Sequence, residues 1–210
     1  MKNIFLLLAL SLLVASCSPK TAPKADREVA HYAVIDTASG SLKLEFVKDL
    51  SKNPDDEDIV FIKVNPGTVT VGTLSSMNDE SYFIMTKPVT KKQLSKLIGT
   101  EPGDDIASET PFVSIEKALD KLGEANPEVT FSLPKARQWD FAFLSGKINE
   151  NDQPICWEWT VMNNGRAYTW RGRIWHIMEM YEEAEKERST DTIKSDLCFR
   201  FVFRENNTAK

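Results

Sequence analysis

The aromatic stretch at residues 155–175 constrains the fold of this chain more than any other part of the sequence. It contains four of the five tryptophans. Residues 156–160 alternate apolar and polar side chains, and this period of two predicts a strand. Asn163-Asn164-Gly165 follows and favours a tight turn, because asparagine and glycine tolerate positive φ. Residues 168–170 are again typical of a strand. We therefore expect a hairpin whose aromatic rings, each covering about 150–250 Å², fill the core.

The composition is that of one globular domain. The chain has 210 residues, of which 41% are hydrophobic, enough to bury a sizeable core. Its formal net charge of -5 argues against non-specific binding to nucleic acid, and no basic stripe offsets this charge. We therefore expect no nucleic acid among the partners.

The N-terminus predicts a signal peptide at residues 1–16. A lysine follows Met1, and an apolar run covers residues 4–14, which is shorter than the about 20 residues of a spanning helix. The run ends in Val14-Ala15-Ser16-Cys17, which resembles the lipobox of bacterial lipoproteins. The resemblance implies cleavage before Cys17 and lipidation of that cysteine, and more than one acyl chain anchors a protein stably. The alternative is an ordinary signal peptide cut near Ser16.

Residues 17–28 are expected to form a lipidated tether, because small residues, proline and lysine dominate them. Residues 29–206 are expected to form a single domain. Ser18 is not an aspartate and no acidic cluster follows Cys17, so we expect anchoring at the periplasmic face of the outer membrane. Lipidation of Cys17 leaves Cys156 and Cys198, which can pair in an oxidising compartment. Two buried free thiols are the alternative.

The rest of the chain alternates strand and helix patterns. Strands are expected at residues 31–37, 42–47, 59–64, 68–73, 81–86 and 197–204, the first two as a hairpin. Thr90-Lys91-Lys92-Gln93 matches a capping box and predicts the start of a helix. Two further helices are expected from Ser114 and from Pro134, and residues 174–184 keep helical spacing.

Seven short blocks, read in order over residues 58–204, resemble the formylglycine-generating enzyme, or sulfatase-modifying factor, superfamily. They are FIKVNPGTVTVG from Phe61, KPVTKKQL from Lys87, PFVS from Pro111, SLPKARQWDFA from Ser132, ICWEWT from Ile155, RGRIW from Arg171 and FR at Phe199. The resemblance implies an α+β, C-type-lectin-like domain with mostly antiparallel sheets and two to four helices. The motif residues that it places in the framework are Trp139, Trp157, Glu158, Trp159, Arg171, Gly172 and Arg200.

The chain departs from the enzymes of this superfamily at their metal sites. Formylglycine-forming members carry two copper-binding cysteines shortly after the RGRIW block, and no cysteine lies between Trp175 and Cys198. Members with an iron site use several histidines, whereas this chain has only His31 and His176. We therefore expect a non-catalytic relative with no catalytic residue, no metal and no cofactor. A residual metal-dependent enzyme is an alternative.

Two groups of residues are candidates for distinct roles. Glu158 lies between two tryptophans, so we expect a buried carboxylate paired with Arg171 or Arg200, with general acid–base work as the alternative. Aromatic and arginine side chains are enriched at interfaces. The expected ligand or partner face, for which ordinary core and rim is the alternative, consists of Tyr168, Trp170, Arg173 and Trp175.

These expectations favour a lipid-anchored cell-envelope protein that acts as a binding or scaffold module. Its partners would be the membrane, through the lipid anchor, and a protein of the cell envelope. A lectin-type receptor that binds its ligand on the aromatic hairpin is the alternative from another class.

Overall fold

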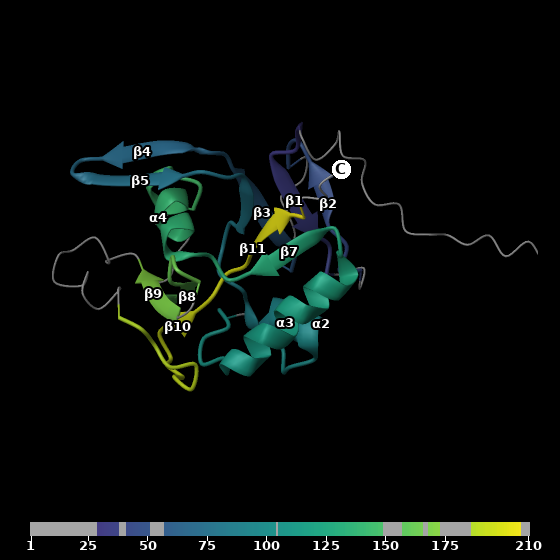
Figure 1. Ribbon diagram of the computed structural model, residues 1–210. Helices are drawn as coiled ribbons and strands as arrows, with labels where there is room; N and C mark the ends of the chain where they lie inside the picture. Colours follow the sequence, from purple (N-terminus) through teal and green to yellow (C-terminus); the bar gives the residue numbers. More distant parts are fainter. Residues whose placement is uncertain are drawn as a thin grey trace, which may run out of the picture.

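The computed structural model describes residues 29–37, 41–50, 57–103, 105–148, 157–165, 168–172 and 186–206. Within these ranges the chain forms sheets of six, three and two strands, packed against three helices (Figure 1). Every pair of neighbouring strands is antiparallel except one. The predicted α+β class with mostly antiparallel sheets is thereby confirmed. The predicted signal peptide, the tether and the helical spacing at residues 174–184 lie outside the described residues.

The six-stranded sheet is the centre of the fold and has the order β2-β1-β3-β6-β11-β7. Its strands are β1 (Tyr32–Ile35), β2 (Glu45–Val47), β3 (Ile59–Val64), β6 (Tyr82–Met85), β7 (Val129–Ser132) and β11 (Val202–Glu205). The predicted hairpin between the first two strands is confirmed, since Tyr32 pairs with Val47. The expected strands at residues 59–64 and 81–86 are β3 and β6.

This sheet separates two hydrophobic cores. Successive side chains of a strand point to opposite faces, so Ile59 and Phe61 enter one core and Val64 enters the other. Phe203 and Val202 on β11 divide in the same way. The first core is covered by α2 (Lys91–Ile98) and α3 (Phe112–Ala125), and the second by α4 (Ala136–Leu144).

The helix α2 confirms the predicted capping box. The backbone N–H of Gln93 donates to Thr90 Oγ1 (3.1 Å), and the N–H of Thr90 donates to Gln93 Oε1 (3.0 Å). Gly99 ends the helix with φ 73°, a conformation that glycine adopts without a Cβ clash.

The other two helices begin two residues away from their expected starts. α3 begins at Phe112 rather than Ser114, because the N–H of Ser114 already bonds to the carbonyl of Pro111 (2.8 Å). α4 begins at Ala136 rather than Pro134, because the side chain of Gln138 accepts the N–H of Lys135 (2.9 Å) and closes the first turn there.

A two-stranded hairpin of β4 (Gly67–Val71) and β5 (Leu74–Asn78) lies along α4 (Figure 1). The sequence predicted β4 but not β5, because β5 contains Ser75 and Ser76, which are not typical of a strand. Val69 on β4 and Leu74 on β5 pack against the core beneath the hairpin, so tertiary contacts form this strand in spite of its polar residues.

The aromatic hairpin is present as β8 (Trp157–Val161) and β9 (Tyr168–Gly172), with the turn at Gly165, where φ is 71°. A third strand, β10 (Leu197–Cys198), pairs with β8 in parallel. The three strands form a separate small sheet.

The single closing strand expected at residues 197–204 is wrong, because this segment forms two strands in two different sheets. After β10 the chain crosses to the large sheet, and its carbonyls at Phe199 and Phe201 accept the N–H groups of Val89 (2.9 Å) and Met85 (3.0 Å). All side chains from Leu197 to Phe203 are buried, so an alternating hydrophobic pattern does not describe their environment.

Among the residues that the structure describes, no helix combines the length and the apolar character needed to cross a bilayer.

Candidate binding site

A buried ion pair joins the small sheet to the segment that crosses to the large sheet. Glu158 and Arg200 are 1% and 0% exposed, and two bonds join them: Nε to Oε2 (2.5 Å) and Nη2 to Oε1 (2.6 Å). Trp139 Nε1 donates to Glu158 Oε2 (3.0 Å), and Arg200 Nη1 donates to the carbonyl of Met85 (2.9 Å). The prediction that Glu158 pairs with a buried arginine is confirmed for Arg200. Both oxygens of this carboxylate are engaged by framework groups.

Arg171, the other expected partner, pairs elsewhere. Its Nε donates to Asp140 Oδ1 on α4 (2.9 Å), and its Nη1 donates to the carbonyl of Trp170 (3.1 Å). Asp140, which follows Trp139 in the same block, was not among the predicted site residues. Gly172 lies at the end of β9, opposite Trp157.

The tryptophans are placed by the register of the hairpin. Trp139 and Trp159 are buried, as expected, and Trp157 is half-buried against both cores. Trp170, which was placed on the expected ligand or partner face, is buried instead, since only 4% of it is accessible, in line with the alternative of ordinary core. Trp170 is directly opposite Trp159, and the two rings meet edge to face with centroids 5.8 Å apart.

The cations of the following loop cover Trp170. Arg188 Cζ lies 4.2 Å and Lys194 Nζ lies 4.6 Å from the ring centroid. The other two residues of the expected partner face, Arg173 and Trp175, lie outside the described residues, as does Cys156.

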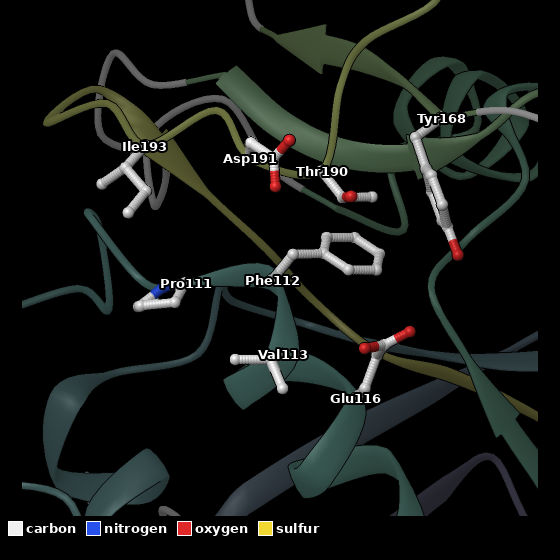
Figure 2. A pocket seen from close by; sticks show the side chains of 8 residues that line it. All are labelled: Pro111, Phe112, Val113, Glu116, Tyr168, Thr190, Asp191 and Ile193. Carbon is white, nitrogen blue, oxygen red and sulfur yellow. The ribbon is translucent and has the colours of Figure 1, made fainter.

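Tyr168 is the described member of that face that borders a pocket. The pocket has a volume of about 360 Å³ (Figure 2). It lies between the start of α3, the start of β9 and the loop before β10, and its lining residues are Pro111, Phe112, Val113, Glu116, Tyr168, Thr190, Asp191 and Ile193. The rings of Phe112 and Tyr168 meet at a centroid distance of 4.5 Å.

Both ends of the loop that forms one wall of the pocket are tied to the domain. The N–H of Arg188 donates to the carbonyl of Tyr168 (2.9 Å), and the carbonyl of Lys194 accepts the N–H of Glu109 (3.1 Å). Between these ends, the N–H of Thr192 donates to the carbonyl of Ser189 (3.1 Å). The wall is therefore positioned by backbone bonds.

The pocket combines apolar side chains with negative charge. Val113 and Ile193 are each 54% exposed at its rim. Glu116 and Asp191 bring two carboxylates, and none of the lining residues is basic. Burial, followed by the charge of Glu116, raises the pKa of the Tyr168 phenol above its ordinary value.

Sequence reasoning found only Tyr168 among these lining residues. Pro111, Phe112 and Val113 were noted only as part of the PFVS block that resembles the superfamily. Two signals could have identified the rim. Val113 lies off the buried stripe of its helix, and Ile193 is the single apolar residue in the polar segment 189–196.

Two observations concern metals and cysteines. Among the described residues, no three or more His, Cys, Asp or Glu side chains are grouped so that they could hold a metal ion. Cys198 is disulfide-bonded. Its expected partner, Cys156, lies outside the described residues, so the identity of the pair stays a prediction.

Comparison with known proteins does not assign this chain to a family. No family model matches the sequence, and no curated protein matches it. A solved structure that is similar to the model is Treponema denticola variable protein 1, with a TM-score of 0.48 and 11% identity over 69% of this chain and 95% of that chain. That score is too low to establish a common fold.

Proposed function

We propose that this chain is a lipid-anchored cell-envelope protein that binds a protein partner through the pocket face and catalyses no reaction itself. The pocket face is defined by Val113, Tyr168 and Ile193 with the pocket between them. The observation that carries the proposal is the exposed apolar rim of a pocket whose wall is tied at both ends. Anchoring follows from Cys17, and the location is the periplasmic face of the outer membrane.

The physical character of the pocket face supports a binding role. Exposed apolar side chains around one hollow are typical of interaction sites, whereas singly scattered ones need no explanation. Val113 and Ile193 both border the same pocket as the aromatic rings of Phe112 and Tyr168. A wall held by backbone bonds is already ordered before a partner arrives, so binding loses less conformational entropy.

The arrangement at Glu158 supports a non-catalytic role. Glu158 is the carboxylate for which acid–base work was the alternative, and its oxygens accept bonds from Arg200 and Trp139 in the interior. A general acid or base must reach the proton that it transfers. Glu158, on β8, is instead bonded to Trp139 on α4 and to Arg200 in the segment between β10 and β11.

We also propose that the domain is a C-type-lectin-like member of the formylglycine-generating enzyme superfamily. Trp139, Glu158 and Arg200 come from three of the seven blocks that resemble this superfamily, and they meet in one hydrogen-bonded network. Side chains of separate blocks that serve one network are what a shared framework requires.

The test is a comparison of partners captured from membranes solubilised in mild detergent. Val113→Asp combined with Ile193→Asp places two charges on the apolar rim, so the amount of each specific partner should fall by about tenfold or more. Val71→Asp is the matched control, because Val71 is 51% exposed on the β4–β5 hairpin. Capture of the same proteins in the same amounts by the double variant would refute the proposed binding face.

A further inference from the structure

The pocket is negatively charged on both sides. Glu116 is on α3 and Asp191 is in the opposite wall, and Figure 2 shows Phe112 between them. Asp191 accepts a bond from Ser189 Oγ (3.3 Å), and neither carboxylate forms an ion pair with the part of the chain that the structure describes. Arg188 and Lys194, at the two ends of the wall, lie over the ring of Trp170 instead. The pocket therefore attracts a cation.

The aromatic lining determines which kind of cation fits. Phe112 supplies a buried apolar surface in the middle of the pocket, and Tyr168 supplies a half-buried ring at its end (Figure 2). An aromatic face attracts a cation placed over it, and arginine takes this position more often than lysine. An aliphatic stem can cover Phe112 while the charged end remains near the carboxylates.

We infer that the pocket binds an arginine side chain of the partner, an assignment that rests on the proposed function. A guanidinium group is planar, stacks on aromatic rings and carries five N–H donors, so it can serve two carboxylates at once. An ammonium group is compact and more strongly hydrated, and it lacks the planar fork. The exposed Val113 and Ile193 then contact apolar residues that flank this arginine in the partner.

The test uses the full-length lipidated chain in detergent micelles, labelled with ¹⁵N at valine and tyrosine. The probe is Nα-acetyl-L-arginine methylamide, which should shift the amide signals of Val113 and Tyr168 in a saturable way and leave Val71 unchanged. The citrulline analogue has the same shape without the charge. It should bind about fivefold more weakly or worse, the scale expected for exposed charge pairs with an aromatic contribution.

Variants assign the binding to the two carboxylates. Glu116→Gln combined with Asp191→Asn should weaken binding of the arginine probe by about fivefold. Glu205→Gln removes a carboxylate at the exposed end of β11 and should leave the affinity unchanged. Because Glu116 and Asp191 are exposed, these substitutions leave the fold intact, and unchanged amide signals elsewhere in the spectrum verify it.

Three results would overturn the inference: no saturable shift with the arginine probe, equal binding of the citrulline analogue, or equal binding of the corresponding lysine amide. Each can occur while partner capture still depends on Val113 and Ile193, in which case the proposed binding face stands and its arginine specificity fails. Loss of that dependence would refute the proposed function separately.

Discussion

Arg200 and Glu158 face each other as a two-bond ion pair in the interior, although they are far apart in the sequence. Their atoms meet at 2.5 and 2.6 Å, and neither side chain is more than 1% exposed. Arg200 lies in the segment that crosses between the small and large sheets, and Glu158 lies on β8. The pair therefore fixes how the two sheets are placed relative to each other.

Replacing only one partner of this ion pair should strongly lower the free energy of unfolding. Arg200→Met leaves the Glu158 carboxylate buried without its cation, so we expect a loss of about 3–5 kcal/mol in the free energy of unfolding. The double variant Arg200→Met with Glu158→Leu should lose less, because no buried charge remains. Urea denaturation measures both.

Arg204→Met is the surface control for that experiment. Arg204 pairs with Glu80 (2.6 Å), and the two side chains are 37% and 44% exposed. An exposed pair contributes about 1 kcal/mol or less. Equal losses for the Arg204 and Arg200 variants would contradict the interior role of the Glu158 pair.

Asn126 should be a second residue whose replacement strongly lowers the free energy of unfolding. This fully buried side chain accepts the N–H of Leu44 (2.9 Å) and donates to the carbonyls of Leu42 (2.7 Å) and Leu122 (2.9 Å). Asn126→Ala removes three bonds and should cost about 2–4 kcal/mol, with faster hydrogen exchange at Leu44. Asn206→Ala, at an exposed position, should cost about 1 kcal/mol or less, and a similar cost for both would count against this account.

The disulfide of Cys198 should join it to Cys156. The chain has three cysteines, and the proposed lipidation of Cys17 would leave Cys156 as the available partner. Mass spectrometry of unreduced peptides should recover a linked pair that contains both residues. Recovery of a peptide that joins Cys17 to Cys198 would contradict both the pairing and the lipid anchor.

The pKa of Tyr168 should respond to Glu116. Glu116→Gln removes one of two causes that raise this pKa, so the pKa falls but stays above 10.0, because burial remains. The folded pKa lies above the unfolded one. The contribution of Tyr168 to stability is therefore fully present below about pH 10 and is lost as the pH rises through the folded pKa. NMR titration of the labelled phenol tests this, and an unchanged or higher pKa in the variant would disprove it.

Membrane attachment should depend on Cys17. Under the proposed lipid anchoring, Cys17→Ala removes the acylated thiol and should move the folded protein from the membrane fraction to the soluble fraction, since acyl chains would supply the anchoring energy. A variant that stays bound through repeated high-salt washes would refute lipid anchoring. Cys156→Ala is the control for loss of a cysteine that is not lipidated.

Local patterns predicted the parts of the fold that local chemistry decides. The short apolar runs of β3 and β6 and the capping box at Thr90 depend on neighbouring residues, and each element appears where it was expected. The strand β5 was missed because its serines become a strand only by pairing with β4 over α4. Trp170 was misplaced because its burial depends on Trp159 and on a distant loop.

The pocket could be predicted only in part for the same reason. Tyr168 was singled out because aromatic and arginine side chains are enriched at interfaces. The other walls come from the start of α3 and from the loop before β10, which only the folded chain brings to Tyr168. Spacing in the sequence carries no information about such a meeting. The only local sign of the pocket is the presence of apolar residues at exposed positions, such as Val113 and Ile193.

The place of β11 in the large sheet sets the order in which this fold can be completed. The strand lies between β6 and β7, and Phe203 stacks on Phe83 (4.7 Å) and packs against Phe131 (5.3 Å). Until the chain has been made through Glu205, β6 and β7 each keep an open edge, and their phenylalanines lack this contact. Sheet closure must follow synthesis of almost the whole domain, and such non-local pairing is slow. In a chain that lacks β11, β7 is separated from β6 and the large sheet is incomplete.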